Sequence, residues 1–228
     1  MMVKKKDSDK STKSGQKMVF LDGEGDRWFE RNQEKLHDTS DDFSLRTIKR
    51  VVGPYSEKVN NILEIGCSNG AKLHDLSTHF SATGFGIDPS KKAIKIGGKQ
   101  YPNLKLSVGT AQDINFSDES FDLVYFGFCL YLLDRNAVLR AVAESDRVLR
   151  SGGFLAILDF EPSGRRRNPY HHRQGVTTFK NSYAEFFTAG GHYYLVAKDS
   201  FTNQSQHFSS DRDERVTINV LFKEIDAY

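Results

Sequence analysis

Cysteine, tryptophan and long apolar runs are scarce in this sequence of 228 residues. It has two cysteines, Cys67 and Cys129, and no C-x-x-C or H-x-x-x-H spacing, so neither a disulfide framework nor a metal site is expected. The apolar run without charge over residues 123–133 is too short to cross a bilayer. The first 17 residues lack the apolar segment of a signal peptide. These absences predict a cytoplasmic protein with free thiols and no membrane partner.

Charge is distributed unevenly along the chain. Residues 1–17 hold six lysines against Asp7 and Asp9, a net charge of +4, so the remainder carries −2 of the total of +2. We expect residues 1–17 to be a disordered basic tail, because almost no apolar side chain anchors them. Residues 18–228 have the length and composition of one globular domain. The slightly acidic balance of this domain argues against a nucleic-acid partner.

Strand-like and helix-like segments alternate from residue 60 onward, as in a parallel α/β sheet. Five strands are expected, at residues 61–65, 82–87, 104–108, 121–126 and 154–160, with helices at 70–79, 89–100 and 135–149. A final pair of strands follows at 193–201 and 215–225, after an irregular loop over 161–176 and a helix over 179–189. The pattern predicts an α/β fold with a seven-stranded, mostly parallel sheet, an antiparallel final strand pair and helices on both faces.

The stretch NNILEIGCSNGAKL, residues 60–73, ends a buried strand in a glycine turn with one acid, Glu64, just upstream. Such a turn is where an adenosine-bearing cofactor approaches the backbone. The dinucleotide pattern G-x-G-x-x-G fits poorly, because Ser68 and Ala71 take its second and third glycine positions. Asp88 ends the next strand about 20 residues later, where an acid can accept both ribose hydroxyls.

Four landmarks in order resemble the class I S-adenosylmethionine (SAM) methyltransferases. They are the glycine turn with Glu64 upstream, the strand end Gly86-Ile87-Asp88, the stretch GTAQDINFSDESFDLVYFGFCLYLL, and RVLRSGGFLAILDF. The resemblance implies a Rossmann-like fold, SAM as cofactor and S-adenosylhomocysteine (SAH) as product. It also implies a cofactor-binding core over 60–160, an N-terminal helical lid over 18–56 and an acceptor side over 161–228.

The resemblance assigns cofactor contacts by position: Glu64, Gly66 and Cys67 at the turn, Asp88, Pro89 and Ser90 at the ribose, Ala111 and Gln112 at the adenine, and Phe126 and Gly127 at the methionine part. Trp28 and Asn32 would close over SAM from the lid. Simpler interpretations stay open. Glu64 could be satisfied by backbone donors, Asp88 could only cap a helix, and Trp28 could only pack against the domain.

The acceptor side is expected beyond the fifth strand, whose carboxyl end meets the ligand edge of an open α/β sheet. His171 or His172 would serve as general base. A run of three cations, Arg165, Arg166 and Arg167, would bind an anionic part of the substrate. Tyr131 and Tyr170 are further candidates for substrate contacts. Equally open is a loop in which the arginines are solvated and the histidines are structural.

The predicted function is methyl transfer from SAM to a small-molecule acceptor, with sugars and nucleotide-sugars among the candidates. DGEGDRWFERN and NPYHH resemble segments of methyltransferases from bacterial cell-surface carbohydrate pathways, such as those associated with pseudaminic acid. Two alternatives stay open: a protein or RNA methyltransferase, and a SAM-binding module that regulates without catalysis. The acidic body disfavours RNA, and the elaborate acceptor loop disfavours the regulatory module. The accepting atom and the oligomeric state stay open.

Overall fold

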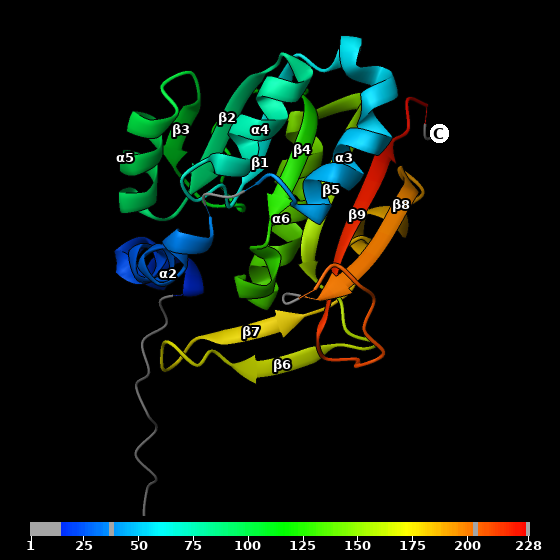
Figure 1. The fold of residues 1–228 in the computed structure, drawn as a ribbon. Coiled ribbons are helices and arrows are strands. Elements are labelled where there is room, and N and C mark those ends of the chain that lie inside the picture. Colours follow the sequence, from blue (N-terminus) through cyan, green and yellow to red (C-terminus); the bar gives the residue numbers. More distant parts are fainter. Residues whose placement is uncertain (1–14, 37–38, 203–204, 227–228) are drawn as a thin grey trace, which may run out of the picture.

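A twisted seven-stranded sheet forms the centre of the protein (Figure 1). The computed structural model describes residues 15–36, 39–202 and 205–226. The strands of the sheet are β1 (Asn61–Ile65), β2 (Thr83–Asp88), β3 (Lys105–Val108), β4 (Phe121–Gly127), β5 (Leu149–Phe160), β8 (Tyr193–Thr202) and β9 (Arg215–Lys223). Their order is β3-β2-β1-β4-β5-β9-β8, with β1 to β5 parallel and β9 antiparallel to both of its neighbours. The predicted sheet is confirmed.

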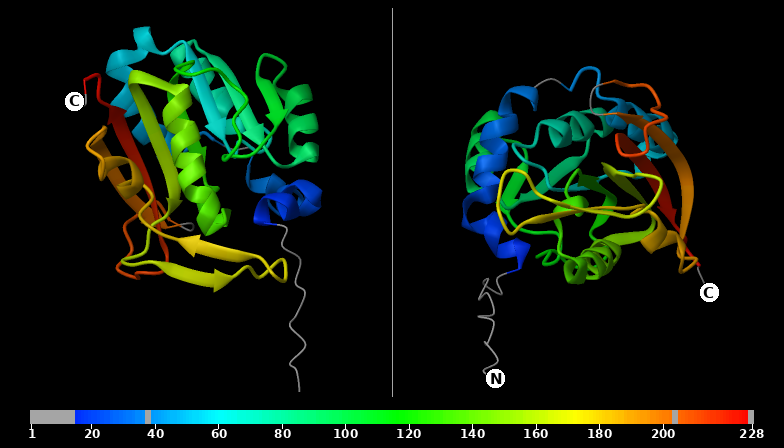
Figure 2. Two further views of the ribbon diagram at one scale, coloured as in Figure 1. Left: turned by 180° about the vertical axis from the view of Figure 1, so that it is seen from behind. Right: turned by 90° about the horizontal axis from the view of Figure 1, so that it is seen from below.

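Helices cover both faces of this sheet (Figure 2). They are α3 (Phe43–Val52), α4 (Ala71–Phe80), α5 (Lys91–Gln100), α6 (Arg135–Val148) and the short α7 (Glu185–Thr188). Ile62 of β1 shares one buried cluster with α3 and α4, whereas its neighbour Leu63 shares another with α6 and α7. Successive strand residues therefore reach opposite faces, as the two-residue period of a strand requires. None of the helices in the described residues is long and apolar enough to span a membrane.

A separate hairpin crosses the carboxyl edge of the sheet, which is the lower edge in Figure 1. It consists of β6 (Arg166–Pro169) and β7 (Thr177–Lys180), paired antiparallel. The irregular loop expected over 161–176 and the helix expected to begin at 179 are therefore wrong. Thr177, Thr178 and Phe179 favour extended backbone, and Gly175, with φ of +84°, allows the connection to turn. Helix forms later than predicted, in α7 alone.

The N-terminal segment packs against the same edge of the sheet (Figure 1). We call residues 15–36 the N-terminal lid; it contains α1 (Gln16–Val19) and α2 (Gly25–Asn32). The predicted end of the basic tail at residue 17 is wrong, because Gln16 is buried and Lys17 forms an ion pair with Asp113 at 3.3 Å. The rest of that predicted tail, residues 1–14, lies outside the described residues.

Gln16 connects three distant parts of the chain at this edge. Its backbone N–H donates to the carboxylate of Asp134 at 2.5 Å, and its side-chain amide donates to the carbonyl of Leu132 at 2.7 Å. Its Oε1 accepts from the N–H of Thr177 in β7 at 2.6 Å. Phe20, Tyr170 and Val176 form a small buried cluster beside it. The lid and the hairpin are therefore fastened to each other as well as to the sheet.

Candidate active site

Two glycines shape the turn between β1 and α4. Gly66 and Gly70 have φ of +79° and +82°, in the left-handed region that residues with a side chain rarely adopt. The N–H groups of Gly66 and Cys67 donate to the carbonyl of Ile87, at 2.8 and 3.1 Å. A Cβ atom on Gly66 would lie 2.8 Å from the Cβ of Cys129. The turn thus joins the ends of β1 and β2 and leaves bare backbone at the sheet edge.

Asp88, at the end of β2, fixes the conformation of this turn. Its Oδ2 accepts from the N–H of Ser68 at 2.9 Å, and its Oδ1 from the N–H of Ser90 at 2.8 Å. Burial raises the pKa of Asp88 to about 6, against the effect of these two donors. Each carboxylate oxygen can accept a further hydrogen bond, so this support is compatible with ribose binding. The N-cap of α5 is Ser90, so the interpretation of Asp88 as the cap is wrong.

The N-terminal lid docks beside Asp88. Asp26 of α2 accepts from the hydroxyl of Ser90 at 2.7 Å and from the N–H of Lys92 at 2.9 Å. The side chain of Lys92 pairs with Glu30 at 2.6 Å. The lid is therefore held on the amino end of α5. Its two predicted site residues, Trp28 and Asn32, both face the larger of two cavities.

Gly66 lines both of these cavities, which lie on either side of the turn. The larger encloses about 660 Å³, within the range of about 300–1,000 Å³ usual for small-molecule sites. The smaller encloses about 70 Å³. It is covered by the lid and reaches the predicted adenine side, being lined by Gln16, Lys17, Phe20, Pro89, Thr110, Ala111, Gln112, Leu132 and Leu133. A ligand that spans both cavities passes over Gly66.

A cluster of buried polar groups lies on the floor of the larger cavity. Glu64 is 2% exposed, and its Oε2 has no hydrogen-bond partner among the described residues. Burial raises the pKa of Glu64 to about 8, against the opposing charge of Lys72. Lys72 forms an ion pair with Asp42 at 2.8 Å. Beside them the hydroxyls of Ser44 and Tyr125 lie 3.3 Å apart. Glu64 is thus a buried acid with one oxygen available to a ligand.

The smaller cavity also contains polar atoms that no described residue satisfies. They are Thr110 Oγ1 and Gln112 Oε1, which flank the buried Ala111 on the loop between β3 and β4. A purine ring carries donors and acceptors at its edge, so these atoms suit an adenine. The predicted positions Ala111 and Gln112 lie together with Pro89 at one cavity.

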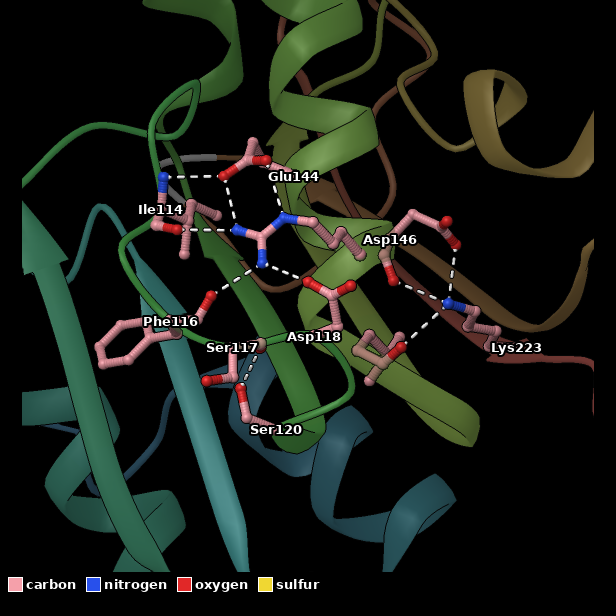
Figure 3. A network of polar contacts seen from close by, with 10 residues as sticks. Ile114, Phe116, Ser117, Asp118, Ser120, Glu144, Asp146 and Lys223 are labelled. Atoms are coloured by element: carbon pink, nitrogen blue, oxygen red, sulfur yellow. Dashed lines mark hydrogen bonds and ion pairs between the residues drawn. The ribbon is translucent and has the colours of Figure 1, made fainter.

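Arg147 of α6 holds the continuation of this loop, residues 114–118, in place (Figure 3). Its guanidinium donates to the carbonyls of Ile114 and Phe116, both at 2.8 Å. It also pairs with the carboxylates of Asp118 and Glu144, each at 2.8 Å. Glu144 in turn accepts from the N–H of Ile114 at 3.0 Å. Arg147 belongs to the R-V-L-R turn of the sequence, so this landmark supports the adenine side from behind.

Aromatic rings form one wall of the larger cavity, and this wall meets the lid where Tyr131 hydrogen bonds to Trp28. Phe128, Tyr131 and Phe160 contact one another, with ring centroids 4.7 to 5.3 Å apart. Phe128 has φ of +59°, an unfavourable backbone conformation for a bulky residue. Asp159 is buried behind this wall and accepts from the N–H groups of Tyr131 and Phe160, at 3.2 and 2.7 Å. Burial raises the pKa of Asp159 to about 8, against these donors.

The hairpin brings only part of the predicted acceptor residues to the cavity. His172 and Tyr170 line it, and Tyr170 accepts from Arg31 of the lid at 2.9 Å. His171 is exposed and lines neither cavity.

The anion clamp predicted for the three arginines is not formed at the site. Arg166 pairs with Asp213 at 3.0 Å, Arg167 lies over the ring of Phe179, and Arg165 is exposed. None of these arginines lines either cavity. Asp213 and Phe179, the partners of Arg166 and Arg167, line neither cavity.

Two further outcomes concern the end of β4 and the cavity floor. Phe126, expected beside the methionine part, is instead fully buried in the core and lines neither cavity. Gly127 does line the larger cavity, and a Cβ atom on it would lie 2.7 Å from Glu64 Oε1. Sequence reasoning misses Lys72 and Asp42 on the floor. The available signal was a lysine directly after the glycine turn and an N-cap acid on the preceding helix.

Comparison with known proteins shows which proteins this chain resembles in sequence. Residues 63–157 match the family model described as a methyltransferase domain. A ubiquinone/menaquinone biosynthesis C-methyltransferase of Campylobacter jejuni is 28% identical over 123 residues, 50% of this chain and 51% of that protein. A demethylmenaquinone methyltransferase of Staphylococcus aureus is 32% identical over 132 residues, 55% and 48% respectively. This chain therefore spans about half the length of these relatives.

Solved structures extend the likeness over nearly the whole chain. The 1,6-didemethyltoxoflavin-N1-methyltransferase of Burkholderia thailandensis, with 1,6-didemethyltoxoflavin and SAH bound, has a TM-score of 0.69 at 12% identity, covering 95% of this chain and 93% of that one. The N-methyltransferase NodS of Bradyrhizobium japonicum, in complex with SAH, has a TM-score of 0.58 at 20% identity, covering 86% and 97%. The fold is the one seen in these two methyltransferases, and residues 63–157 are similar in sequence to a methyltransferase domain.

Proposed function

We propose that this chain is a SAM-dependent methyltransferase that acts on a small molecule. The observation that carries the proposal is the unsatisfied polar lining on both sides of Gly66. Glu64 Oε2 lies on the larger cavity, and Gln112 Oε1 lies on the smaller one. A buried polar atom without a partner costs about 1–3 kcal/mol, so such atoms mark positions where a ligand is expected to complete the structure.

The residues present fit SAM part by part. Glu64 offers an acidic oxygen to the ammonium group, and Ala111 with Gln112 offers a polar-edged wall to the adenine. Asp88 lines neither cavity itself but stands between Ile87 and Pro89 of the smaller one, from where it offers acceptors to the ribose hydroxyls. Gly66 leaves room for the ligand to cross the backbone. Bound there, SAM supplies a methyl group on a positively charged sulfur, and the neutral thioether needs no further activation as the leaving group.

The contribution of the chain is then positioning and exclusion of water. Holding two reactants in line can supply about 7–11 kcal/mol of a barrier. The lid covers the smaller cavity, and the aromatic wall with Tyr170 and Trp28 encloses the larger one. The smaller cavity, at about 70 Å³, is below the volume range usual for ligand sites. We therefore expect α1 to move outward when an adenosine group enters and to close again over it.

For the acceptor we propose a compact molecule with a flat ring. Phe128, Tyr131 and Phe160 offer ring faces and edges to the larger cavity, and Trp28 of the lid, which hydrogen bonds to Tyr131, adds a fourth aromatic ring to its lining. The names of a ubiquinone/menaquinone biosynthesis methyltransferase and a didemethyltoxoflavin methyltransferase also denote ring compounds, which supports this class. A cavity volume of about 660 Å³ favours a small molecule over a protein or RNA substrate.

The sugar or nucleotide-sugar acceptor expected from the sequence has weaker support. The arginines expected to bind the phosphate groups of a nucleotide-sugar, Arg165, Arg166 and Arg167, lie outside the cavity. His172 keeps its predicted role in the proposal. It lines the cavity and contacts Tyr170 edge to face, with ring centroids 5.3 Å apart. From there its imidazole can accept a proton when the methyl acceptor is a hydroxyl.

The test is transfer of a labelled methyl group from SAM to a panel of acceptors. The panel contains quinols, hydroxylated heteroaromatic compounds, nucleotide-sugars, a protein mixture and RNA. We expect transfer to a ring compound. His172→Gln should lower turnover on a hydroxyl acceptor by about 100-fold, and His171→Gln, the matched control, should not. Transfer to nucleotide-sugars alone would overturn the acceptor class, and absence of both transfer and SAH binding would overturn the proposed function.

A further inference from the structure

The floor of the larger cavity carries a cation that the proposed cofactor contacts do not use. Lys72 lies in the first turn of α4, immediately after the glycine turn, and its side chain is 27% exposed, into the cavity. Asp42 caps α3 on the other side of the floor and forms the ion pair with Lys72 at 2.8 Å. Glu64 of β1 completes this charged floor. Three elements therefore meet there through one cation and two acids.

The hydrogen bonds of Asp42 show how much of Lys72 is already committed. Asp42 Oδ1 accepts from the N–H of Leu45 at 3.1 Å and from the hydroxyl of Ser44. Only Asp42 Oδ2 pairs with Lys72. An ammonium group has three N–H donors, so one carboxylate oxygen cannot saturate it. Lys72 also lies near the hydroxyl of Tyr125, and it lines a cavity that contains the unpartnered Glu64 Oε2.

We propose that Lys72 and Glu64 together bind the α-amino-acid head group of the methyl donor, with Lys72 on its carboxylate and Glu64 on its ammonium. This inference rests on the proposed function and adds the anchor for the carboxylate. That anionic group would be buried at the floor, and a buried charge needs a partner of opposite sign. Among the described residues lining this cavity, the other cationic or titratable nitrogen groups belong to Lys35 and His172, and both side chains are exposed.

Asp42 has a defined part in this arrangement. In the absence of a ligand it compensates the charge of Lys72 and keeps the lysine side chain against α3. A zwitterionic head group carries one charge of each sign, so its carboxylate can gain Lys72 and its ammonium group the ionised Glu64, while Asp42 keeps its ion pair. Lys72 thereby becomes a specificity residue, because it distinguishes a nucleoside that carries an amino acid from one that does not.

The test compares two ligands that differ in the amino-acid group. SAH carries it, and 5′-methylthioadenosine has the same thioether nucleoside without it. We would titrate the wild type and Lys72→Met with each ligand by calorimetry. A charge-assisted hydrogen bond is lost for SAH alone, so its dissociation constant should rise about 10- to 100-fold. The dissociation constant for 5′-methylthioadenosine should change by less than about twofold.

Two further variants separate binding from folding. Lys72→Met leaves Asp42 without its partner, so Asp42→Asn/Lys72→Met removes both charges and retains an N-cap residue on α3. This double variant should fold like the wild type and still discriminate poorly between the two ligands. Lys72→Arg should recover part of the affinity for SAH.

Each outcome of these titrations has a distinct meaning. Equal losses for both ligands in the double variant would show that Lys72 only supports the fold and would overturn the inference. Unchanged SAH affinity would also overturn it and would leave the floor lysine to a carboxylate of the acceptor. If the wild type bound neither ligand, the proposed function itself would fail, before the question of Lys72 arose.

Discussion

The binding of SAH to this chain should strengthen as pH rises, because Glu64 must lose a proton to serve as a carboxylate partner for the ligand's ammonium group. Burial raises the pKa of Glu64 to about 8, the nearby charge of Lys72 opposes this shift, and the negative charges of Asp88 and Asp42 add to it. Below pH 8 the acid is therefore mostly protonated in the free protein. Binding then releases a proton to the solvent.

The magnitude follows from this pKa. With a value of about 8, the ionised fraction of Glu64 rises roughly eightfold between pH 6.5 and 7.5. The association constant for SAH should rise by the same factor. Asp88, whose pKa burial raises to about 6, is already mostly ionised over this interval and adds little. At pH 6.5 nearly one proton should be released for each SAH molecule bound.

Calorimetry measures both quantities. Titrations at pH 6.5, 7.0 and 7.5, in pairs of buffers that differ in ionisation enthalpy, give the affinity and the number of protons released. Glu64→Gln is the matched control, since it keeps the shape and one oxygen acceptor but cannot ionise. It should bind more weakly at pH 7.5, with little pH dependence and almost no proton release. A wild-type affinity that is flat over this interval, or a variant with the same slope as the wild type, would refute the role of Glu64.

Three other changes test the supports of the site. Arg147→Met removes the donors to the carbonyls of Ile114 and Phe116. It should lower the free energy of unfolding by about 2 kcal/mol, which corresponds to a fall in melting temperature of about 4–8 °C. An unchanged melting curve would show that Arg147 does not stabilise the loop. Gly127→Ala places a Cβ 2.7 Å from Glu64 Oε1 and should weaken SAH binding about tenfold or more, whereas the control Gly98→Ala, with open space around it, should not. Removal of residues 1–17 should lower the melting temperature by several degrees more than removal of 1–14, because only the longer deletion takes away Gln16; equal melting temperatures would show that Gln16 does not fasten the lid.

The sheet was predictable because its signals are local. Apolar runs between glycine or proline turns mark β1 to β5, and the observed strand β1 has the predicted ends, 61 and 65. The hairpin was not predictable in this way, since β6 is made of Arg166 to Pro169 and has no apolar alternation. Tyr170 and Val176 at its turn pack on Phe20 of the lid instead, about 150 residues earlier in the chain. Such a long-range contact leaves no periodic signal in the sequence.

The site residues also divide into those that local sequence signals predict and those that only long-range packing brings together. Glu64 and Gly66 lie at the end of β1, and Asp88 ends β2. Their positions at the ends of two parallel strands bring them to one edge of the sheet. Lys72 and Asp42 meet only because α3 packs beside α4, which no spacing announces. Phe128 lines the cavity where Phe126 was expected, and the reason lies in the backbone. β4 ends at Gly127, and the positive φ of Phe128 turns its ring toward the cavity.

A crystal structure of the chain with SAH would show directly whether the two cavities on either side of Gly66 form one cofactor site. We expect the adenine against Ala111 and Gln112 in the smaller cavity, with α1 displaced outward from its present position, the ribose hydroxyls on Asp88, and the homocysteine part beside Glu64 in the larger cavity. The thioether sulfur should face the aromatic wall of Phe128, Tyr131 and Phe160. Crystals that bind no SAH at high ligand concentration, or that hold it away from Gly66, would contradict the account.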